Sequence, residues 1–584
     1  MATTGALAPR ARPFVGLARP RFGIETLILG GVAAVVGYLV LSPLALLVVT
    51  SFRRYDFTGQ AIGYAFTLDN YREVFLGGEL AAAAWSSALY AGGGTLLAVA
   101  FGTALAWVVE RTNAPFRTSF TLLAAATYFV PGVLMALGWN ALANVRIGTL
   151  NRLLQSFVPV TQGPLDINTI AGMTWVFGTH LYPIVFLIMG AAFRTMDPAL
   201  EEAAALSGAG IWARLRTVTL AVSRPAILSA LLIVFVRGLE SFDVPLILGL
   251  PGKINVLTTE VYSTATLHRP PELGISATLG LILLAVSIAG VYVYRSATAR
   301  ALAFATITGK GYRPQPLQLG RARHVIALVC GVFFFVTLAL PLLSVFWLSL
   351  FPFVRQFSLD AIPRASFAQY AYVLSYSAMV EAFRNSIINS VLVATVVVLL
   401  TSIAAWIAVR SRVPGRAALD TLAFAPIGVP GTIMGVSVLL VYLTLPIPVY
   451  GTLFIVTIAH ITLFLPYGMR LASDALLRIH PQLEEVSALS GAGWLRTYRA
   501  IVLPLILPGL LAAWVTILAA SFRELSTSIF LASPQARFVS VIMYTAYTDG
   551  NTTAAAALGM VMMLVVFVLA VLARIFSRLV RVAA

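Results

Sequence analysis

The sequence predicts an all-α polytopic membrane protein with about 12 transmembrane helices arranged as two parallel six-helix repeats. Hydrophobic residues make up 59% of its 584 residues and charged residues only 10%, a composition far from that of soluble domains. The segment PALEEAAALSGAG at 198–210 returns as PQLEEVSALSGAG at 481–493, with 10 of 13 positions identical. Such a match indicates that the chain is an internal duplication.

Apolar runs long enough to cross a bilayer, about 20 residues each, occur twelve times along the chain. Six lie in each half, and an even number of spans gives both halves the same orientation, related by an axis along the membrane normal. The predicted spans are 24–50, 84–109, 120–142, 168–193, 224–248, 273–295, 324–350, 383–409, 419–443, 450–470, 505–530 and 552–574.

The placement of lysine and arginine predicts that both termini are cytoplasmic. Four arginines precede the first apolar run, which is too long for a cleaved signal peptide, so we expect residues 1–23 to form a cytoplasmic N-terminal tail. With this orientation, 26 of the 39 basic residues lie at or beside cytoplasmic connections. The predicted layout is a first half at 24–295, a cytoplasmic linker at 296–323 and a second half at 324–584.

The repeat extends over both halves, but its offset changes once. Arg111 and Pro131 match Arg410 and Pro430 at an offset of 299, whereas residues from Pro183 onwards match at an offset of 283. The first half therefore carries 16 additional residues. We place them in the polar outer connection 144–167, where an insertion costs little stability.

The repeated stretch is predicted to form a short helix followed by a glycine turn. Glu201 and Glu202 lie in the first turn, where a helix favours negative charge, and Ala203 continues the helix. Gly208 and Gly210 permit the backbone conformations that end it. The second copy carries the corresponding features at Glu484, Glu485, Gly491 and Gly493.

These stretches, with the pattern Glu-Ala-Ala, three residues and Gly, resemble the EAA loops of permease subunits in ATP-binding-cassette (ABC) importers. The first copy departs from the family pattern at 218–221 and the second at 485–487. The resemblance implies the type I ABC importer permease fold, with ATPase-coupling EAA loops at 194–223 and 471–504. It also implies two copies of a cytoplasmic ABC ATPase that bind ATP and magnesium, a periplasmic or lipid-anchored substrate-binding protein, and a bacterial inner-membrane location.

The sequence carries none of the motifs expected of an enzyme. Neither of its two lysines, Lys253 and Lys310, is followed by the Ser or Thr of a P-loop, so ATP hydrolysis is expected in a separate subunit. His180 and His460 fall within spans, where each is expected to hydrogen-bond a neighbouring helix, and the single cysteine, Cys330, lies in an apolar run. We therefore expect no cofactor in this chain. Because basic residues are scattered between apolar runs, we also expect no nucleic acid partner.

Ionisable residues within predicted spans mark a candidate translocation pathway. Arg237, Glu240 and Asp243 lie near the end of the fifth span, and Arg523 and Glu524 lie near the end of the eleventh. Charge inside a bilayer is costly, so these residues point to function, although Arg237 and Glu240 could instead form a structural ion pair. Three acids against two arginines leave one acid without a mutual partner, and such a carboxylate is expected to take up a proton or a cation.

The run RGLESFDVPLILGLPG and the later SFRELSTS resemble the fused permeases of ferric-iron importers. Carboxylates are the hard oxygen donors that a highly charged cation prefers, which agrees with ferric iron, but the sequence defines no metal ligand set. Related permeases serve thiamine, phosphonate or polyamines, and these substrates stay open. An ion-driven secondary transporter with parallel six-helix repeats is the alternative from a different class, and the duplicated EAA loops favour the importer.

Overall fold

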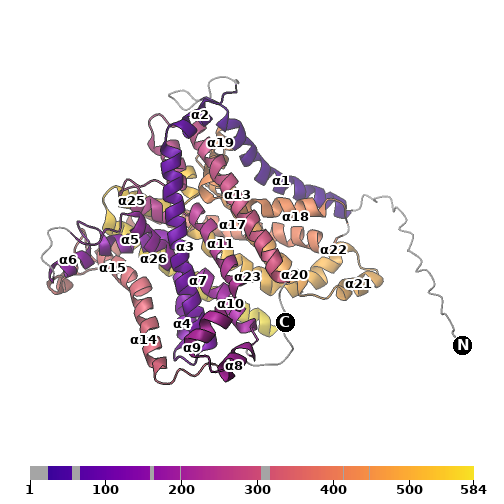
Figure 1. Cartoon of the computed structure of the whole chain (residues 1–584). Coiled ribbons are helices and arrows are strands. Elements are labelled where there is room, and N and C mark those ends of the chain that lie inside the picture. The colour runs from indigo at the N-terminus through magenta and orange to yellow at the C-terminus, as the bar shows by residue number, and fades with distance from the viewer. Residues whose placement is uncertain are drawn as a thin grey trace.

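The computed structural model describes residues 24–54, 66–157, 163–197, 199–303, 316–411, 413–445 and 447–583. The predicted N-terminal tail 1–23 and residues 304–315 of the predicted linker lie outside the described residues. Within the described ranges the protein is built from helices, with two isolated β-bridges (Figure 1). The all-α prediction is therefore confirmed.

Nine helices in the described part of the chain are long and apolar enough to cross a membrane, and three bent helix pairs raise the number to as many as twelve. The range includes the twelve predicted spans. The nine are α1 (Ile24–Ser51), α3 (Glu79–Arg111), α7 (Ile170–Thr195), α13 (Leu273–Ala303), α14 to α15 (Ala322–Ser349), α17 (Ser377–Arg410), α20 (Leu453–Leu477), α22 to α23 (Trp494–Phe522) and α26 (Thr552–Ala583).

The bent pairs place helix ends within spans predicted to be continuous. α4 (Arg117–Phe129) meets α5 (Gly132–Ala143) at 98°, and the corresponding segment Arg416–Gly428 meets α19 (Gly431–Thr444) at 111°. Pro131 and Pro430 lie at these two breaks. Because proline has no backbone N–H group to donate, the preceding helix does not continue through it. The third pair, Ile211–Val222 with α11 (Arg224–Glu240), bends by 69° at the start of α11.

The duplication predicted from the sequence is present element by element. Helices α2 (Asp69–Leu76), α8 (Ala199–Leu206) and α9 (Ile211–Arg214) correspond to α16 (Ala368–Ser375), α21 (Gln482–Leu489) and α22 (Trp494–Thr497), at offsets of 299 and then 283. α6 (Thr149–Gln155) has no counterpart among the described helices of the second half. It lies in the connection where the sequence predicts the 16 additional residues.

The first spanning helix of each half packs against the other half. α1 contacts α18 (Arg416–Phe424) and α19, with Tyr38 Oη 3.2 Å from Tyr442 Oη, and α15 (Leu340–Ser349) contacts α5. Figure 1 shows α1 beside α18 and α19 on one side of the molecule and α15 beside α5 on the other. This exchange ties the two halves into one body.

The fifth and eleventh spans end earlier than predicted. α11 stops at Glu240 rather than near 248, and α23 (Leu503–Phe522) stops well before 530. Pro245 prevents α11 from continuing. In the second half the Glu524 carboxylate instead accepts the backbone N–H groups of Thr527 (2.9 Å) and Ser528 (3.2 Å), which starts a new turn.

The segments that follow these early ends fold back into the interior instead of forming surface connections. η2 (Pro245–Gly249) and α12 (Leu257–Tyr262) are buried throughout, and α24 (Ser528–Leu531) and α25 (Val539–Thr548) are largely buried. The rings of Tyr262 and Phe530, one from each half, meet with centroids 5.7 Å apart. The two halves therefore share an apolar contact beyond the ends of α11 and α23.

The helix α13 continues to Ala303, beyond the end of its apolar span at Ser296 and into the predicted linker. The described end of the linker is anchored to the first half. Leu317 N–H donates to Arg111 O (2.8 Å), and Asn113 N–H donates to Leu317 O (3.1 Å).

Single cysteines in a Cys330→Ala background test the predicted orientation. Leu206→Cys and Leu489→Cys, at positions 91% and 88% exposed, should be protected from an impermeant thiol reagent in intact cells and should react after permeabilisation. Phe157→Cys, just beyond α6, should react in intact cells. Labelling of Leu489→Cys from outside would overturn the arrangement with both halves in one orientation.

Candidate functional site

A pocket of about 360 Å³ lies between the two halves. Its first-half wall comes from α4, α5, α7 and the end of α11, and its second-half wall comes from α19, α20, α23 and the residues that follow α23. The structure brings together in this pocket all the ionisable residues of the predicted pathway, namely Arg237, Glu240, Asp243, Arg523 and Glu524.

Two helices begin within the pocket, and a carboxylate from elsewhere in the same half lies beside the first residue of each. Asp243 is so close to the start of α5 that a Cβ atom at Gly132 would be 2.8 Å from Asp243 Oδ2. In the second half, a Cβ atom at Gly431 would be 3.1 Å from Glu524 Oε1. The positive N-terminal ends of α5 and α19 therefore stabilise negative charge here, and both glycines allow the close approach.

Both arginines reach across the interface between the halves. Arg237 donates to the Tyr467 hydroxyl on α20, and its guanidinium carbon lies 5.9 Å from the centroid of that ring. Arg523 Nη1 donates to the carbonyl oxygens of Tyr128 (2.8 Å) and Val130 (3.3 Å) at the C-terminus of α4. A helix C-terminus favours a cation, so each half supplies the groups that the other half's arginine requires.

The acids differ in how far their charge is compensated. Glu240 lies 3.3 Å from the Arg237 guanidinium, as in the structural ion pair that the sequence left open. Arg523 and Glu524 are adjacent in the chain but do not pair, since Glu524 instead lies 3.1 Å from His460 Nε2. Across the part of the chain that the structure describes, Asp243 takes part in no ion pair. Asp243 is therefore the acid whose charge has the least local compensation from side chains.

The two intramembrane histidines have different surroundings. His460 is buried, with Nδ1 2.9 Å from Ser521 Oγ and 3.1 Å from Asn389 Nδ2, which confirms the expected contact with neighbouring helices. His180 lines the pocket from α7, and among the described residues its Nδ1 has no hydrogen-bond partner. The expectation is therefore wrong for that atom. A search of the same ranges finds no group of three or more His, Cys, Asp and Glu side chains placed to hold a metal ion.

The repeated loops form the predicted helix and glycine turn. In the first copy, Gly208 N–H donates to Ala205 O and Ala209 N–H donates to Ala204 O, both at 3.0 Å, which closes α8 in a Schellman motif. Gly208 has a φ of +81° and Gly491 a φ of +76°, so both occupy the left-handed region that glycine favours.

Gly210 and Gly493 differ from the prediction. Their φ angles are −66° and −68° with extended ψ, a conformation open to any residue, and they begin α9 and α22 rather than ending the preceding helix. The other predicted coupling residues Ala203, Glu202 and Glu485 lie exposed on α8 and α21.

One carboxylate in each loop anchors the loop to the end of a spanning helix. Glu201 pairs with Arg111 at the end of α3. Glu484 lies 3.1 Å from Arg410 Nε at the end of α17 and accepts a hydrogen bond from Trp406 Nε1 (3.0 Å). In the sequence, Arg111 and Arg410 stand out only as equivalent positions of the repeat. Their match at offset 299 is the signal that could have suggested this shared role.

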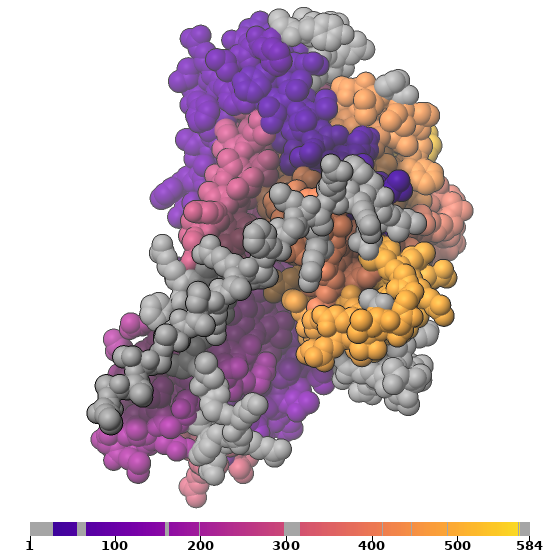
Figure 2. Space-filling view, turned by 90° about the vertical axis from the view of Figure 1, so that its right-hand side faces the viewer, coloured from indigo at the N-terminus to yellow at the C-terminus, as the bar shows by residue number. Residues whose placement is uncertain are grey.

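The outer face of each loop is apolar and exposed. Leu206 and Leu489 occupy equivalent positions and are 91% and 88% exposed, and Trp212 is 77% exposed. Figure 2 shows the two loop regions as separate projections, magenta for the first copy and light orange for the second. Large apolar side chains exposed in this way favour burial against another protein.

The second half of the chain matches the family model of the binding-protein-dependent transport system inner membrane component over residues 397–582. The matched residues form one unit of this kind of permease. The first half of the chain repeats the helices of the matched region and carries the other copy of the loop.

Relatives of this chain differ in the substrate that their names give. The ferric transport system permease protein FbpB of Actinobacillus pleuropneumoniae is 25% identical over 480 residues, which is 80% of this chain and 67% of that relative. The spermidine/putrescine transport system permease protein PotB of Haemophilus influenzae is 25% identical over 263 residues, 44% of this chain and 89% of that relative. A solved structure of a bacterial ABC transporter involved in the import of alginate covers 44% of this chain and 94% of its own, with 18% identity and a TM-score of 0.36.

The anchoring of the second loop can be tested with Glu484→Gln. Hydrogen bonds to charged groups contribute about 1.5–3 kcal/mol, so loss of the carboxylate should expose the loop to trypsin at least about ten times faster in inverted membrane vesicles. Glu485→Gln is the matched control, because Glu485 is exposed and forms no ion pair within the described ranges. Equal cleavage of the two variants would contradict the anchoring role.

Proposed function

We propose that the chain is the membrane permease of an ATP-driven ABC importer, with both pore-forming halves in one chain, and that it conducts ferric iron. The observation that carries this proposal is the pocket between the halves, where three carboxylates and two arginines meet. Ionisable groups in a membrane are expensive, and their concentration at the junction of two repeats is typical of a transport pathway.

The electrostatics of the pocket favour a cation. With every side chain ionised, three carboxylates and two arginines carry a net charge of −1. The negative C-terminal ends of α11 and α23 and the positive N-terminal ends of α5 and α19 all lie here and offset one another, so the excess carboxylate decides the sign. The available ligands are carboxylate and phenol oxygens, which suit a hard cation. The likeness to a ferric transport permease supports iron within this class.

The exposed apolar side chains of the two loops support the proposal that a separate ATPase supplies the energy. Each loop offers one docking surface, so we infer two copies of a cytoplasmic ABC ATPase, with ATP and magnesium bound there and not by this chain. Anchoring by Glu201 and Glu484 would transmit movement of each ATPase to α3 and α17. A periplasmic or lipid-anchored binding protein would deliver substrate at the outer face of the bacterial inner membrane.

A polyamine is the second candidate substrate. Its support is the set of aromatic side chains that share the pocket with the carboxylates, together with the likeness to a spermidine/putrescine permease. Ring faces attract organic cations. The aromatic residues are Tyr128, Phe129, Phe464 and Tyr467. Uptake of radiolabelled ferric iron and of radiolabelled putrescine by cells expressing the complete transporter separates the two candidates.

Asp243→Asn tests the cation pathway. Because Asp243 forms no ion pair in the described part of the chain, removal of its charge should leave the folded protein nearly unchanged, with a melting temperature within about 2 °C of the wild type. Loss of a charged ligand worth about 1.5–3 kcal/mol should lower iron uptake at least about tenfold.

Asp474→Asn on α20 is the control, since Asp474 lies outside the pocket, half-exposed beside Arg470. The control should take up iron normally. If Asp243→Asn loses thermal stability while uptake per folded molecule is unchanged, the carboxylate is structural and the pathway assignment is wrong.

Gly491→Val tests coupling to the ATPase. No atom lies within 4 Å of the added Cβ, so the strain comes from the backbone, where a left-handed conformation costs a non-glycine residue about 1–2 kcal/mol. Substrate-stimulated ATP hydrolysis by the reconstituted complex should fall several-fold while the permease still inserts in the membrane.

The matched control is Gly493→Val, which adds the same side chain two residues away in open space and at a φ of −68°. It should retain coupling. Equal loss in both variants would show that the left-handed turn is not the reason for the glycine.

A further inference from the structure

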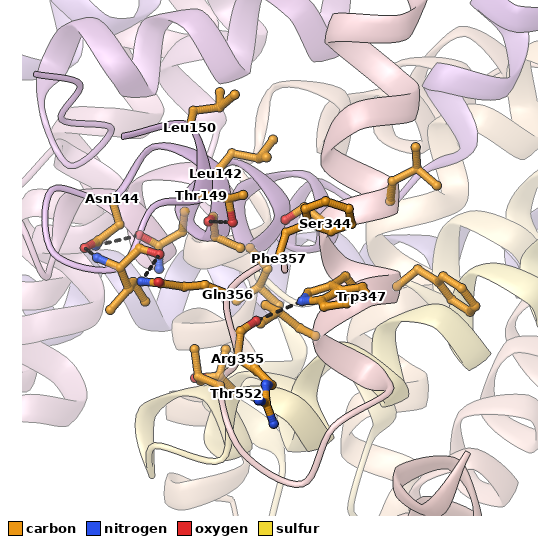
Figure 3. A pocket seen from close by; sticks show the side chains of 18 of the residues that line it. Leu142, Asn144, Thr149, Leu150, Ser344, Trp347, Arg355, Gln356, Phe357 and Thr552 are labelled. Carbon is orange, nitrogen blue, oxygen red and sulfur yellow. Dashed lines mark hydrogen bonds between the residues drawn. The ribbon is translucent and has the colours of Figure 1, made fainter. Parts of the chain in front are cut away.

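A second and larger pocket, of about 950 Å³, shares no lining residue with the pocket of the pathway. Its walls come from both halves: α5 and α6 of the first, and α15, the loop after it and the start of α26 of the second. Figure 3 shows these elements meeting around side chains that are mostly apolar. Ligand sites in proteins have volumes of about 300–1,000 Å³, so the pocket is large enough for a bound molecule.

The pocket lies at the ends of spanning helices. α15 ends at Ser349 and α5 at Ala143, and the predicted outer connections that follow them line the pocket. Trp347, near the end of α15, donates from Nε1 to Arg355 O (2.9 Å), as Figure 3 shows. Tryptophan at the end of a span is typical of the level of lipid headgroups.

The pocket opens to the surface beside large apolar side chains. Leu343 on α15, Leu153 on α6 and Phe357 in the loop line the pocket and are 53%, 56% and 57% exposed. Side chains of this size are stable when exposed to hydrocarbon rather than to water. A hydrocarbon chain that enters the pocket at these side chains would therefore meet a mostly apolar wall.

The polar part of the pocket carries a single charge. Arg355 is the only charged side chain in the lining, and it forms no ion pair in the described ranges. Its guanidinium carbon lies 5.9 Å from the centroid of Phe351, and Gln356 and Thr552 add neutral polar groups nearby. Guanidinium groups bind phosphate by charge-assisted hydrogen bonds.

We propose that this pocket binds a phospholipid of the outer leaflet. Its phosphate pairs with Arg355, and an acyl chain lies in the part of the pocket lined by α6 and α15. An anionic headgroup joined to a long hydrocarbon tail matches a lone arginine beside a large apolar cavity. Because both halves contribute to the walls, the bound lipid bridges them on the side opposite the coupling loops.

A photoreactive phosphatidylglycerol with a diazirine on its acyl chain tests the site in nanodiscs that contain the full-length permease. Crosslinks should concentrate on α6 and α15, at positions such as Leu153 and Leu343. Arg355→Gln should lower labelling of these helices about tenfold, because it removes the charge that holds the phosphate. Arg364→Gln is the matched control, since Arg364 is exposed in the same loop and does not line the pocket.

Leu343→Trp provides a second variant that leaves the arginine in place. The larger side chain enters the pocket from an exposed position, so the fold should persist, as a melting curve would show, while acyl-chain labelling falls. Excess unlabelled phosphatidylglycerol should displace the probe and inorganic phosphate should not. Labelling spread evenly over all spans, equal labelling of Arg355→Gln and Arg364→Gln, or displacement by phosphate alone would each overturn the proposal.

Discussion

Two arginines cross the interface between the halves, and the organisation of the pathway depends on where they find partners. Arg237 reaches the hydroxyl of Tyr467, and Arg523 reaches the carbonyl oxygens of Tyr128 and Val130. A guanidinium in a low-dielectric region must be hydrogen-bonded, and neither half satisfies its own arginine fully. Any change in the relative position of the halves must therefore exchange these partners, which makes the pocket sensitive to movement of one half against the other.

Broken helices make such a pocket possible. A continuous span satisfies all its backbone groups internally and presents only side chains, whereas the breaks at Pro131 and Pro430 bring helix ends to the interface. The N-termini of α5 and α19 then receive Asp243 and Glu524, and the small residues Gly132 and Gly431 leave room for the carboxylates. Because a helix N-terminus stabilises negative charge, these carboxylates can lie within the protein without an arginine partner for each one.

The two halves agree in backbone and differ in chemistry. The anchoring pairs at the loops are alike, with Glu201 and Arg111 in the first half and Glu484 and Arg410 in the second. In the pocket, the equivalent positions of the two repeats hold different residues. At the offset of 283, Arg523 is the counterpart of Glu240, and Ser526 is the counterpart of Asp243. Two equivalent loops agree with the proposed docking of two copies of one partner. A substrate in the pocket would contact both walls at the same time, so the two walls need not carry the same residues.

The sequence by itself determined the all-α class, the approximate positions of the spans, the duplication, the place of the 16 additional residues and the turn at Gly208 and Gly491. These depend on local periodicity, local backbone preference and comparison of the chain with itself. Only the tertiary structure decided the partners of the ionisable groups. Arg523 and Glu524 are adjacent yet unpaired, while Arg111 and Glu201 pair across 90 positions. Glu524 likewise lies beside His460, 64 positions earlier in the chain. The physical reason is that an ion pair depends on the distance and orientation of groups on different helices, and no single helix specifies those.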